Sequence, residues 1–142
     1  MNIKIVDGEK IRKNLLENFT NYTHHLRDEI CPEDEVWIDK NTDPSERFEL
    51  LYQAKQEKHY LSNNIPWDQA IDLAAQDTLK LRSQHHPEHK SPKLKLLRKI
   101  KDISIFLVKG STVRDHADAN FVEGGHDLVY SYIPPNEIWI YE

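Results

Sequence analysis

The stretch between Arg114 and Asp127 gathers side chains that could bind a metal ion or transfer protons. It holds two histidines and four carboxylates within fourteen residues. Imidazole and carboxylate groups bind divalent metals and are also the commonest general acids and bases. The candidate metal ligands are Asp118, His126 and Asp127, and the candidate catalytic residues are Arg114, Asp115, His126 and Glu137.

Gly124 and Gly125 stand directly before His126. Two glycines allow the backbone to turn sharply or to approach a ligand closely. A polar surface loop with a Gly-Gly turn explains the same residues, and we prefer this simpler interpretation. We therefore expect no cofactor, and a divalent metal at this loop is the alternative.

The sequence contains an internal repeat, which shows which polar residues are present in both copies. Residues 3–38 recur without a gap as residues 105–140, and twelve of the thirty-six positions are identical. Unrelated stretches of this composition would share about two. Three ionisable pairs are among the identical positions: Arg12/Arg114, His24/His126 and Glu35/Glu137.

A structural role for these pairs is favoured, because a repeat preserves what the fold needs. The arginine would pair with the glutamate of a neighbouring strand, and the histidine would cap a backbone group. The functional alternative is a binding surface. Its candidate residues are Arg12, His24, Glu35, Trp37 and Trp139.

Each copy of the repeat predicts three strands. Residues 3–6 and 9–12 flank Asp7-Gly8, a strong signal for a two-residue hairpin with positive φ. Lys109-Gly110 takes the same place between residues 103–108 and 111–114. The third strands are expected at residues 35–39 and 137–141, each preceded by a proline.

Helices are expected between the copies. Asp43-Pro44 is typical of a helix start, Pro66 opens a second helix, and Ser91-Pro92 a third that carries a basic run up to Lys101. The polar residues 83–90 predict a loop. A solvated helix is the preferred interpretation of the basic run, ahead of a phosphate-binding patch.

The predicted fold class is α+β: two repeated three-stranded β units, residues 3–40 and 103–142, flanking a helical segment in a single compact domain. Its parts would be unit A at 1–40, a helical insert at 43–101 and unit B at 103–142. No helix follows unit B. It would therefore share one helical layer with unit A or find its cover on another subunit.

Bulk composition narrows the class of protein. The net charge of −5 disfavours general nucleic-acid binding, and the single cysteine, Cys31, excludes an internal disulfide. No apolar run reaches membrane-spanning length, and the first residues lack a signal-peptide core. We expect a soluble cytoplasmic protein, or one in the host cytoplasm if it is a phage or secreted effector protein.

Several motifs resemble an uncharacterised family of small phage and mobile-element proteins. They include Val113-Arg114-Asp115, Asp118-Ala119-Asn120-Phe121, Gly124-Gly125-His126, Glu137-Ile138-Trp139-Ile140 and, in the first half, Glu35-Val36-Trp37-Ile38-Asp39 and Trp67-Asp68-Gln69-Ala70. The resemblance implies a metal-binding helix that carries His-Glu followed by a further Glu. This arrangement is suited to zinc-dependent hydrolysis. Here Tyr52 and Gln53 take the His-Glu positions, so a site that needs that helix should be inactive.

The sequence therefore predicts a small protein-binding module of a mobile element, of accessory, effector or anti-defence type and without catalysis. The alternative is a metal-dependent hydrolase that uses the unit B His/Asp loop. The expected partner is another protein or a second copy in a homodimer. We expect neither membrane nor nucleic acid as a partner.

Overall fold

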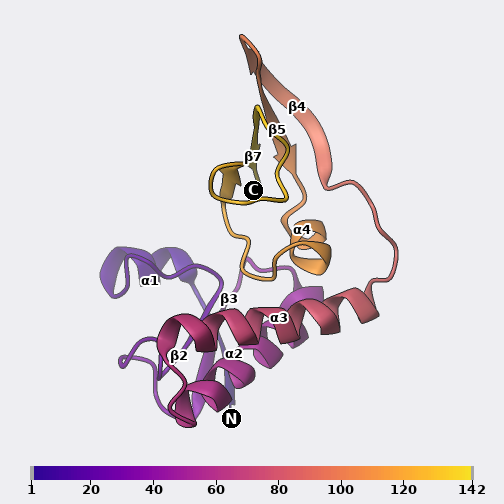
Figure 1. Ribbon diagram of the computed structural model, residues 1–142. Coiled ribbons are helices and arrows are strands. Elements are labelled where there is room, and N and C mark those ends of the chain that lie inside the picture. Colours follow the sequence, from indigo (N-terminus) through magenta and orange to yellow (C-terminus); the bar gives the residue numbers. More distant parts are fainter. Residues whose placement is uncertain (1, 142) are drawn as a thin grey trace. The chain divides into compact units, whose positions relative to one another are not determined.

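The computed structural model describes residues 2–141, which form an α+β fold, as predicted (Figure 1). Its two small mixed sheets have three and four strands, so the second unit has one strand more than predicted. The elements are β1 (Asn2–Val6), α1 (Gly8–Asn14), β2 (Tyr22–His24), β3 (Glu35–Asp39), η1 (Pro44–Glu46), α2 (Arg47–Ser62), α3 (Trp67–His85), β4 (Lys93–Ile100), β5 (Ile103–Val108), α4 (Gly110–His116), β6 (Gly124–His126) and β7 (Glu137–Ile140). Among the described residues, no helix has the length and apolar character to cross a membrane.

The chain divides into two compact units, and the boundary lies inside α3. Unit 1 comprises Met1–Thr78 and unit 2 comprises Leu79–Glu142. Each unit contains one copy of the repeat and one sheet. The strand order is β1-β3-β2 in unit 1 and β4-β5-β7-β6 in unit 2.

Both copies of the repeat follow the same backbone path. β1 runs parallel to β3 and β2 antiparallel to it, and β5, β7 and β6 repeat this arrangement. Even the register is shared, since Ile3 pairs with Val36 and Ile105 pairs with Ile138. The sequence offset of 102 therefore relates equivalent positions of the two sheets.

The predicted hairpins at Asp7-Gly8 and Lys109-Gly110 are wrong, because a short helix follows each first strand. Asp7 is the N-cap of α1, and its side chain accepts a hydrogen bond from the Lys10 amide at 3.3 Å. No glycine of the described residues has a positive φ, so the hairpin turn does not form. The helix begins the crossover that a parallel strand pair requires.

The predicted third helix at residues 91–101 is also wrong. These residues form β4, which pairs antiparallel with β5. Lys93-Leu94-Lys95-Leu96 alternates with period two, which is a strand pattern. Lys101, with φ of 55°, lies in the turn before β5. The basic run thus lies on an exposed strand.

The two sheets form their cores on opposite faces. In unit 1 the core contains Val36 and Ile38, which pack against α2 residues Leu50 and Ala54. The equivalent residues of unit 2 are Ile138 and Ile140, and Ile140 is 43% exposed. The unit 2 core consists instead of Val108, Val113, Phe121, Ile133 and Trp139.

The expected Gly-Gly turn is wrong as well, because Gly124 and Gly125 form the start of β6. A Cβ on Gly124 would lie 2.3 Å from the Trp139 carbonyl oxygen, and one on Gly125 would lie 2.4 Å from the Tyr130 ring. The glycines therefore allow β6 to lie close to β7 and to Tyr130. The two glycines thus permit a close contact between parts of the protein itself and not the approach of a ligand.

We expect Gly124→Ala to destabilise the protein by about 2 kcal/mol, because backbone must move to admit the methyl group. Gly110→Ala should cost less, since its nearest neighbours are side-chain atoms, Nη1 of Arg114 at 2.8 Å and the Tyr141 ring at 3.0 Å, which can move without a shift of the backbone. Urea denaturation of both variants measures the difference. Equal losses would contradict the close contact between β6 and β7.

Candidate functional site

A buried histidine–glutamate pair joins α2 to β2 in unit 1. Nε2 of His24 lies 2.9 Å from Oε1 of Glu57, and both side chains are 0% exposed. β2 places His24, and α2 places Glu57 one turn after Gln53, which is also buried. Glu49, Gln53 and Glu57 recur every four residues, so this helix buries polar side chains together with Leu50 and Ala54.

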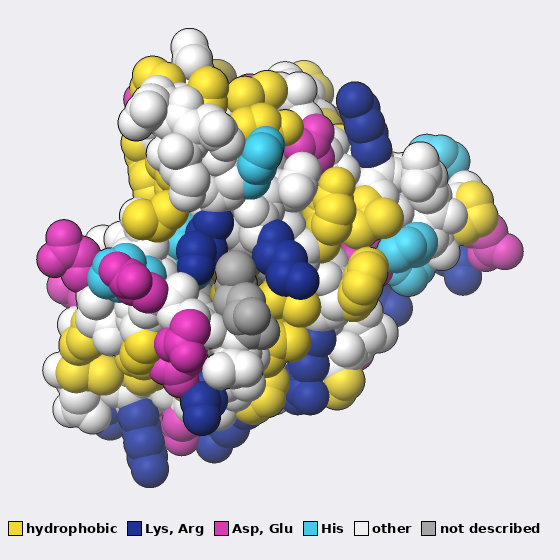
Figure 2. All heavy atoms as spheres, turned by 90° about the horizontal axis from the view of Figure 1, so that it is seen from below, with side chains coloured by type: hydrophobic (Ala, Val, Ile, Leu, Met, Phe, Trp, Pro, Cys, Tyr) yellow, Lys and Arg dark blue, Asp and Glu magenta, His cyan; other side chains and the backbone are white. Residues whose placement is uncertain are grey.

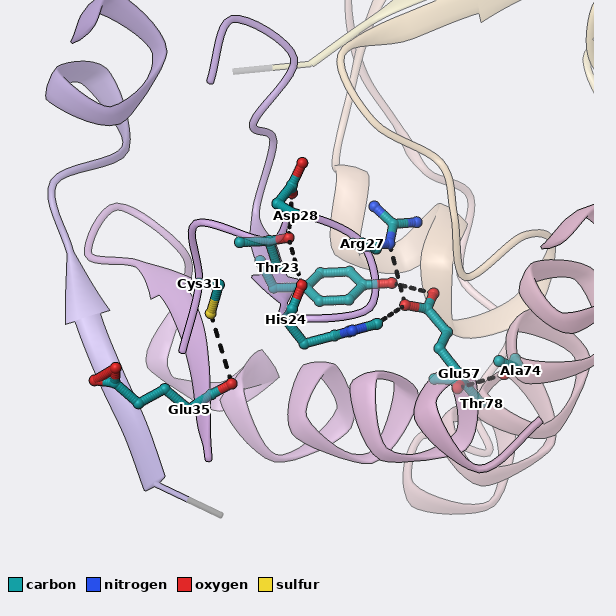
Figure 3. A network of polar contacts seen from close by, with 10 residues as sticks. Thr23, His24, Arg27, Asp28, Cys31, Glu35, Glu57, Ala74 and Thr78 are labelled. Carbon is teal, nitrogen blue, oxygen red and sulfur yellow. Dashed lines mark hydrogen bonds and ion pairs between the residues drawn. The ribbon is translucent and has the colours of Figure 1, made fainter. Parts of the chain in front are cut away.

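Three donors converge on the Glu57 carboxylate (Figure 3). The Tyr22 hydroxyl donates to Oε2 at 2.6 Å, while His24 and Arg27 Nε donate to Oε1, the latter at 3.1 Å. The Arg27 guanidinium also lies over the Tyr22 ring, 5.1 Å from its centroid. We call Tyr22, His24, Arg27 and Glu57 the Glu57 cluster.

The environment of the Glu57 cluster favours the charged form of Arg27. Burial by itself would lower the pKa of Arg27, but neighbouring Tyr22 and Glu57 outweigh this and raise it. A buried carboxylate is tolerated when its oxygens are paired and hydrogen-bonded. The cluster therefore fixes α2 against the sheet, and it presents no exposed carboxylate or imidazole to a substrate.

The second copy keeps the histidine but loses the cluster. Gly124 replaces Tyr22, Val129 replaces Arg27, and among the described residues of unit 2 no helix corresponds to α2. His126 is half-buried, and its Nδ1 accepts a hydrogen bond from the Leu128 amide at 3.2 Å. His126 thus caps a backbone group, the structural role expected from the sequence.

The candidate metal ligands do not form a set. Among residues 2–141, no group of three His, Cys, Asp or Glu side chains is placed to hold a metal ion. Asp118, His126 and Asp127 therefore do not converge, and Asp118 instead accepts a hydrogen bond from the Asn120 amide at 2.9 Å. Geometry gives no support to the hydrolase alternative.

The repeated arginines bind backbone, and the expected Arg–Glu pairs are wrong. Nη1 of Arg114 donates to the Phe121 carbonyl at 3.1 Å, and Nη1 of Arg12 lies 3.4 Å from the equivalent carbonyl of Phe19. Arg12 also pairs with Asp39 at 3.6 Å. Each arginine thereby ties the loop that follows its helix to that helix.

The repeated glutamates pair with lysines. Glu35 lies 3.9 Å from Lys4 Nζ, and Glu137 lies 2.8 Å from Lys93 Nζ. Burial would raise the pKa of Glu137, but hydrogen bonds from Lys93 and the Trp139 indole outweigh this and lower it. Both glutamates stabilise the start of the third strand.

The remaining candidates differ in their burial and contacts. Asp115 accepts a hydrogen bond from buried Arg82 at 3.0 Å and belongs to the contact between α4 and the end of α3. His24 and Trp139 are buried and cannot line a binding surface, contrary to the expectation from sequence. Trp37 is half-buried, and the Arg12 side chain is 37% exposed.

Sequence reasoning passed over Tyr22, Arg27 and Glu57 as members of a site. The available signal was the column Glu49-Gln53-Glu57 on a helix that also carries Leu50 and Ala54. Polar residues on the apolar side of a helix indicate buried polar partners. Tyr22 and Arg27 have no identical counterpart in the second copy, so the repeat did not mark them.

We expect Glu57→Ala to lower the free energy of unfolding by about 3–5 kcal/mol, because His24 and Arg27 would lose their buried acceptor. Glu33→Ala is the matched control, since the Glu33 side chain is 86% exposed and should contribute little. Thermal and urea denaturation of the full chain measure both effects. A loss below 1 kcal/mol for Glu57→Ala would contradict the proposed role of the cluster.

Cys31 should be an unreactive thiol. It is fully buried, its thiol donates to the Glu35 carbonyl at 3.6 Å, and burial raises its pKa to about 11. The raised value stabilises the fold fully below the thiol's ordinary pKa of 9.0, and this contribution is lost as the pH rises from there toward 11.

Native protein should therefore resist alkylation at pH 8, and unfolded protein should react at once. Its stability should fall between pH 9 and 11 more steeply than that of Cys31→Ala. Mass spectrometry after iodoacetamide treatment and denaturation curves at each pH provide the measurements. Rapid labelling of folded protein at pH 8 would show that the thiol is accessible.

Comparison with known proteins identifies no relative of this chain. No protein-family model matches it, no curated protein matches it, and no solved structure matches it. Its function is therefore argued from its own residues.

Proposed function

We propose that this chain is a non-catalytic protein-binding module whose contact surface is the open face of the unit 2 sheet. Residues at directly paired positions lie on the same face of a sheet, and alternate residues of a strand lie on the same side. The pairings therefore put one set of residues together as the open face: Ile103, Ile105, Leu107, Ile138, Ile140, Gly124, His126, Ile100, Lys95 and Arg98.

The observation that carries this proposal is the difference between equivalent faces of the two sheets. Val36 and Ile38 are fully buried beneath α2, whereas their equivalents Ile138 and Ile140 are half-buried and 43% exposed, and Ile103 on the same face is 39% exposed. An apolar patch rimmed by polar groups is typical of a protein-binding site. The open face has such a rim, with basic residues on β4 and His126 on β6.

β4 enlarges the surface that is available to a partner. Every residue of β4 is exposed, including Leu94 at 61% and Leu97 at 46%. Figure 2 shows the molecule from the side opposite to β4, where apolar side chains also lie beside Lys and Arg side chains. A partner on the open face would cover Ile100 of β4, which is 46% exposed, and would remove apolar area from water, which stabilises a complex.

The closed Glu57 cluster favours binding over catalysis. A substrate must reach catalytic groups, yet the His24 and Glu57 side chains are 0% exposed. The further assignment to an accessory, effector or anti-defence protein of a mobile element follows from the sequence resemblance alone.

Ile140→Lys should weaken binding of the partner at least tenfold, because a charge would lie in the centre of an apolar contact. Ile3→Lys is the matched control, since Ile3 is also 43% exposed but lies in unit 1. Tagged wild-type and variant proteins would be compared by quantitative capture from lysate, then by calorimetry with the captured partner. Light scattering would separate self-association from binding to another protein.

Equal capture by the wild type and Ile140→Lys would exclude the open face as the contact surface. A strictly monomeric wild-type protein that retains no partner would count against the binding function itself.

A further inference from the structure

We infer that the open face of unit 2 is a seat for an acidic amphipathic α-helix of a partner protein, with one helix carboxylate bound by Nε2 of His126. This inference rests on the proposed binding function and specifies the chemistry of the partner. In unit 1 the equivalent face of the sheet is covered by a helix, α2.

The covered face in unit 1 shows how a helix fits this sheet. Leu50 and Ala54 of α2 pack on Val36 and Ile38, and Glu57 one turn later reaches Nε2 of His24. Unit 2 presents Ile138, Ile140 and His126 at the equivalent positions, in the same strand register. A helix with a similar apolar stripe and a carboxylate at the position of Glu57 would meet equivalent groups.

His126 is prepared to donate from the same ring atom as His24. Its Nδ1 accepts the Leu128 amide hydrogen, so the neutral ring carries its proton on Nε2. Within residues 2–141, this Nε2 makes no hydrogen bond. A partner carboxylate would therefore find a donor that the chain itself leaves unused.

The charges around the open face select an acidic helix. Lys95 and Arg98 pair with Leu107 and Ile105, which places both bases at the β4 side of this face. Unit 2 has ten Lys and Arg against eight Asp and Glu, whereas unit 1 has nine against sixteen. Acidic residues flanking the apolar stripe would complement this rim.

A partner protein is a better occupant than α2 of a second copy. The apolar residues of α2 are already buried against the unit 1 sheet, so α2 would have to leave that site.

The test uses the full chain with isotopically labelled isoleucine methyl groups. The probe is a synthetic peptide of residues 46–63, which contains the sequence of α2 and exists free of the sheet. It carries three acidic and three basic residues, so its Lys55→Glu form is the acidic probe. Binding should shift the methyl signals of Ile138 and Ile140 and leave that of Ile38 unchanged. An isolated helix of this length is only marginally stable, so the dissociation constant should lie in the high micromolar range or above.

A double-mutant cycle tests the carboxylate contact. His126→Ala in the protein and Glu57→Gln in the peptide should each weaken binding about tenfold, and together should cause little further loss. His59→Ala, at an exposed histidine of unit 1, is the control and should not change binding. A second peptide with Lys55→Glu should bind more tightly, with an advantage that shrinks at high salt.

Two results would overturn the helix seat: no shift of the Ile138 and Ile140 methyl signals at millimolar peptide, or fully additive losses in the cycle. If Ile140→Lys abolishes partner capture while the peptide leaves these signals unmoved, the binding function stands and the helix is wrong. If the peptide binds with coupling but Ile140→Lys leaves partner capture unchanged, the seat stands and the proposed function fails.

Discussion

The structure of unit 1 depends on one buried carboxylate, that of Glu57. Its two oxygens accept hydrogen bonds from a tyrosine, a histidine and an arginine that belong to β2 and the loop after it. Because an unpaired carboxylate in this position would be costly, the helix can dock only where all three donors meet it. Apolar contacts between α2 and the sheet bury nonpolar surface, and the carboxylate defines where along the sheet the helix lies.

The two halves of the chain show how one backbone path serves two different cores. Arg12 and Arg114 make the same carbonyl contact after equivalent helices, and the strand registers agree pair by pair. The halves diverge in which face they fill, since Trp139 is buried in one and Val36 and Ile38 in the other. The two copies keep the contacts that define the backbone path. They differ in the contacts that bury a face of the sheet.

The sequence was sufficient for some of these features and not for others. The offset of 102 predicted equivalent strands, and Asp43-Pro44 and Pro66 predicted the starts of the central helices. Asp7-Gly8 was misread because an N-cap and a hairpin turn use the same residues, and only the parallel pairing downstream decides between them. β4 was misread because its leucines fit helical spacing as well as alternation.

The Glu57 cluster lay beyond sequence reasoning for a different reason. Glu57 is thirty-three residues from His24, and only folding brings their side chains together. The polar column on α2 indicates that Glu57 has a buried partner, but the sequence does not say which residues that partner comprises. Contacts that span the sequence in this way are found from the fold and not from spacing.

The boundary between the units, at Thr78 and Leu79, falls within a continuous helix, and this has a consequence for any attempt to isolate either half. A cut there would leave one fragment ending, and the other beginning, in the middle of a helical turn, with up to four carbonyls or four amides deprived of their partners. Fragments that retain α3 whole, with overlapping ends, are therefore the appropriate starting point for dissecting this protein.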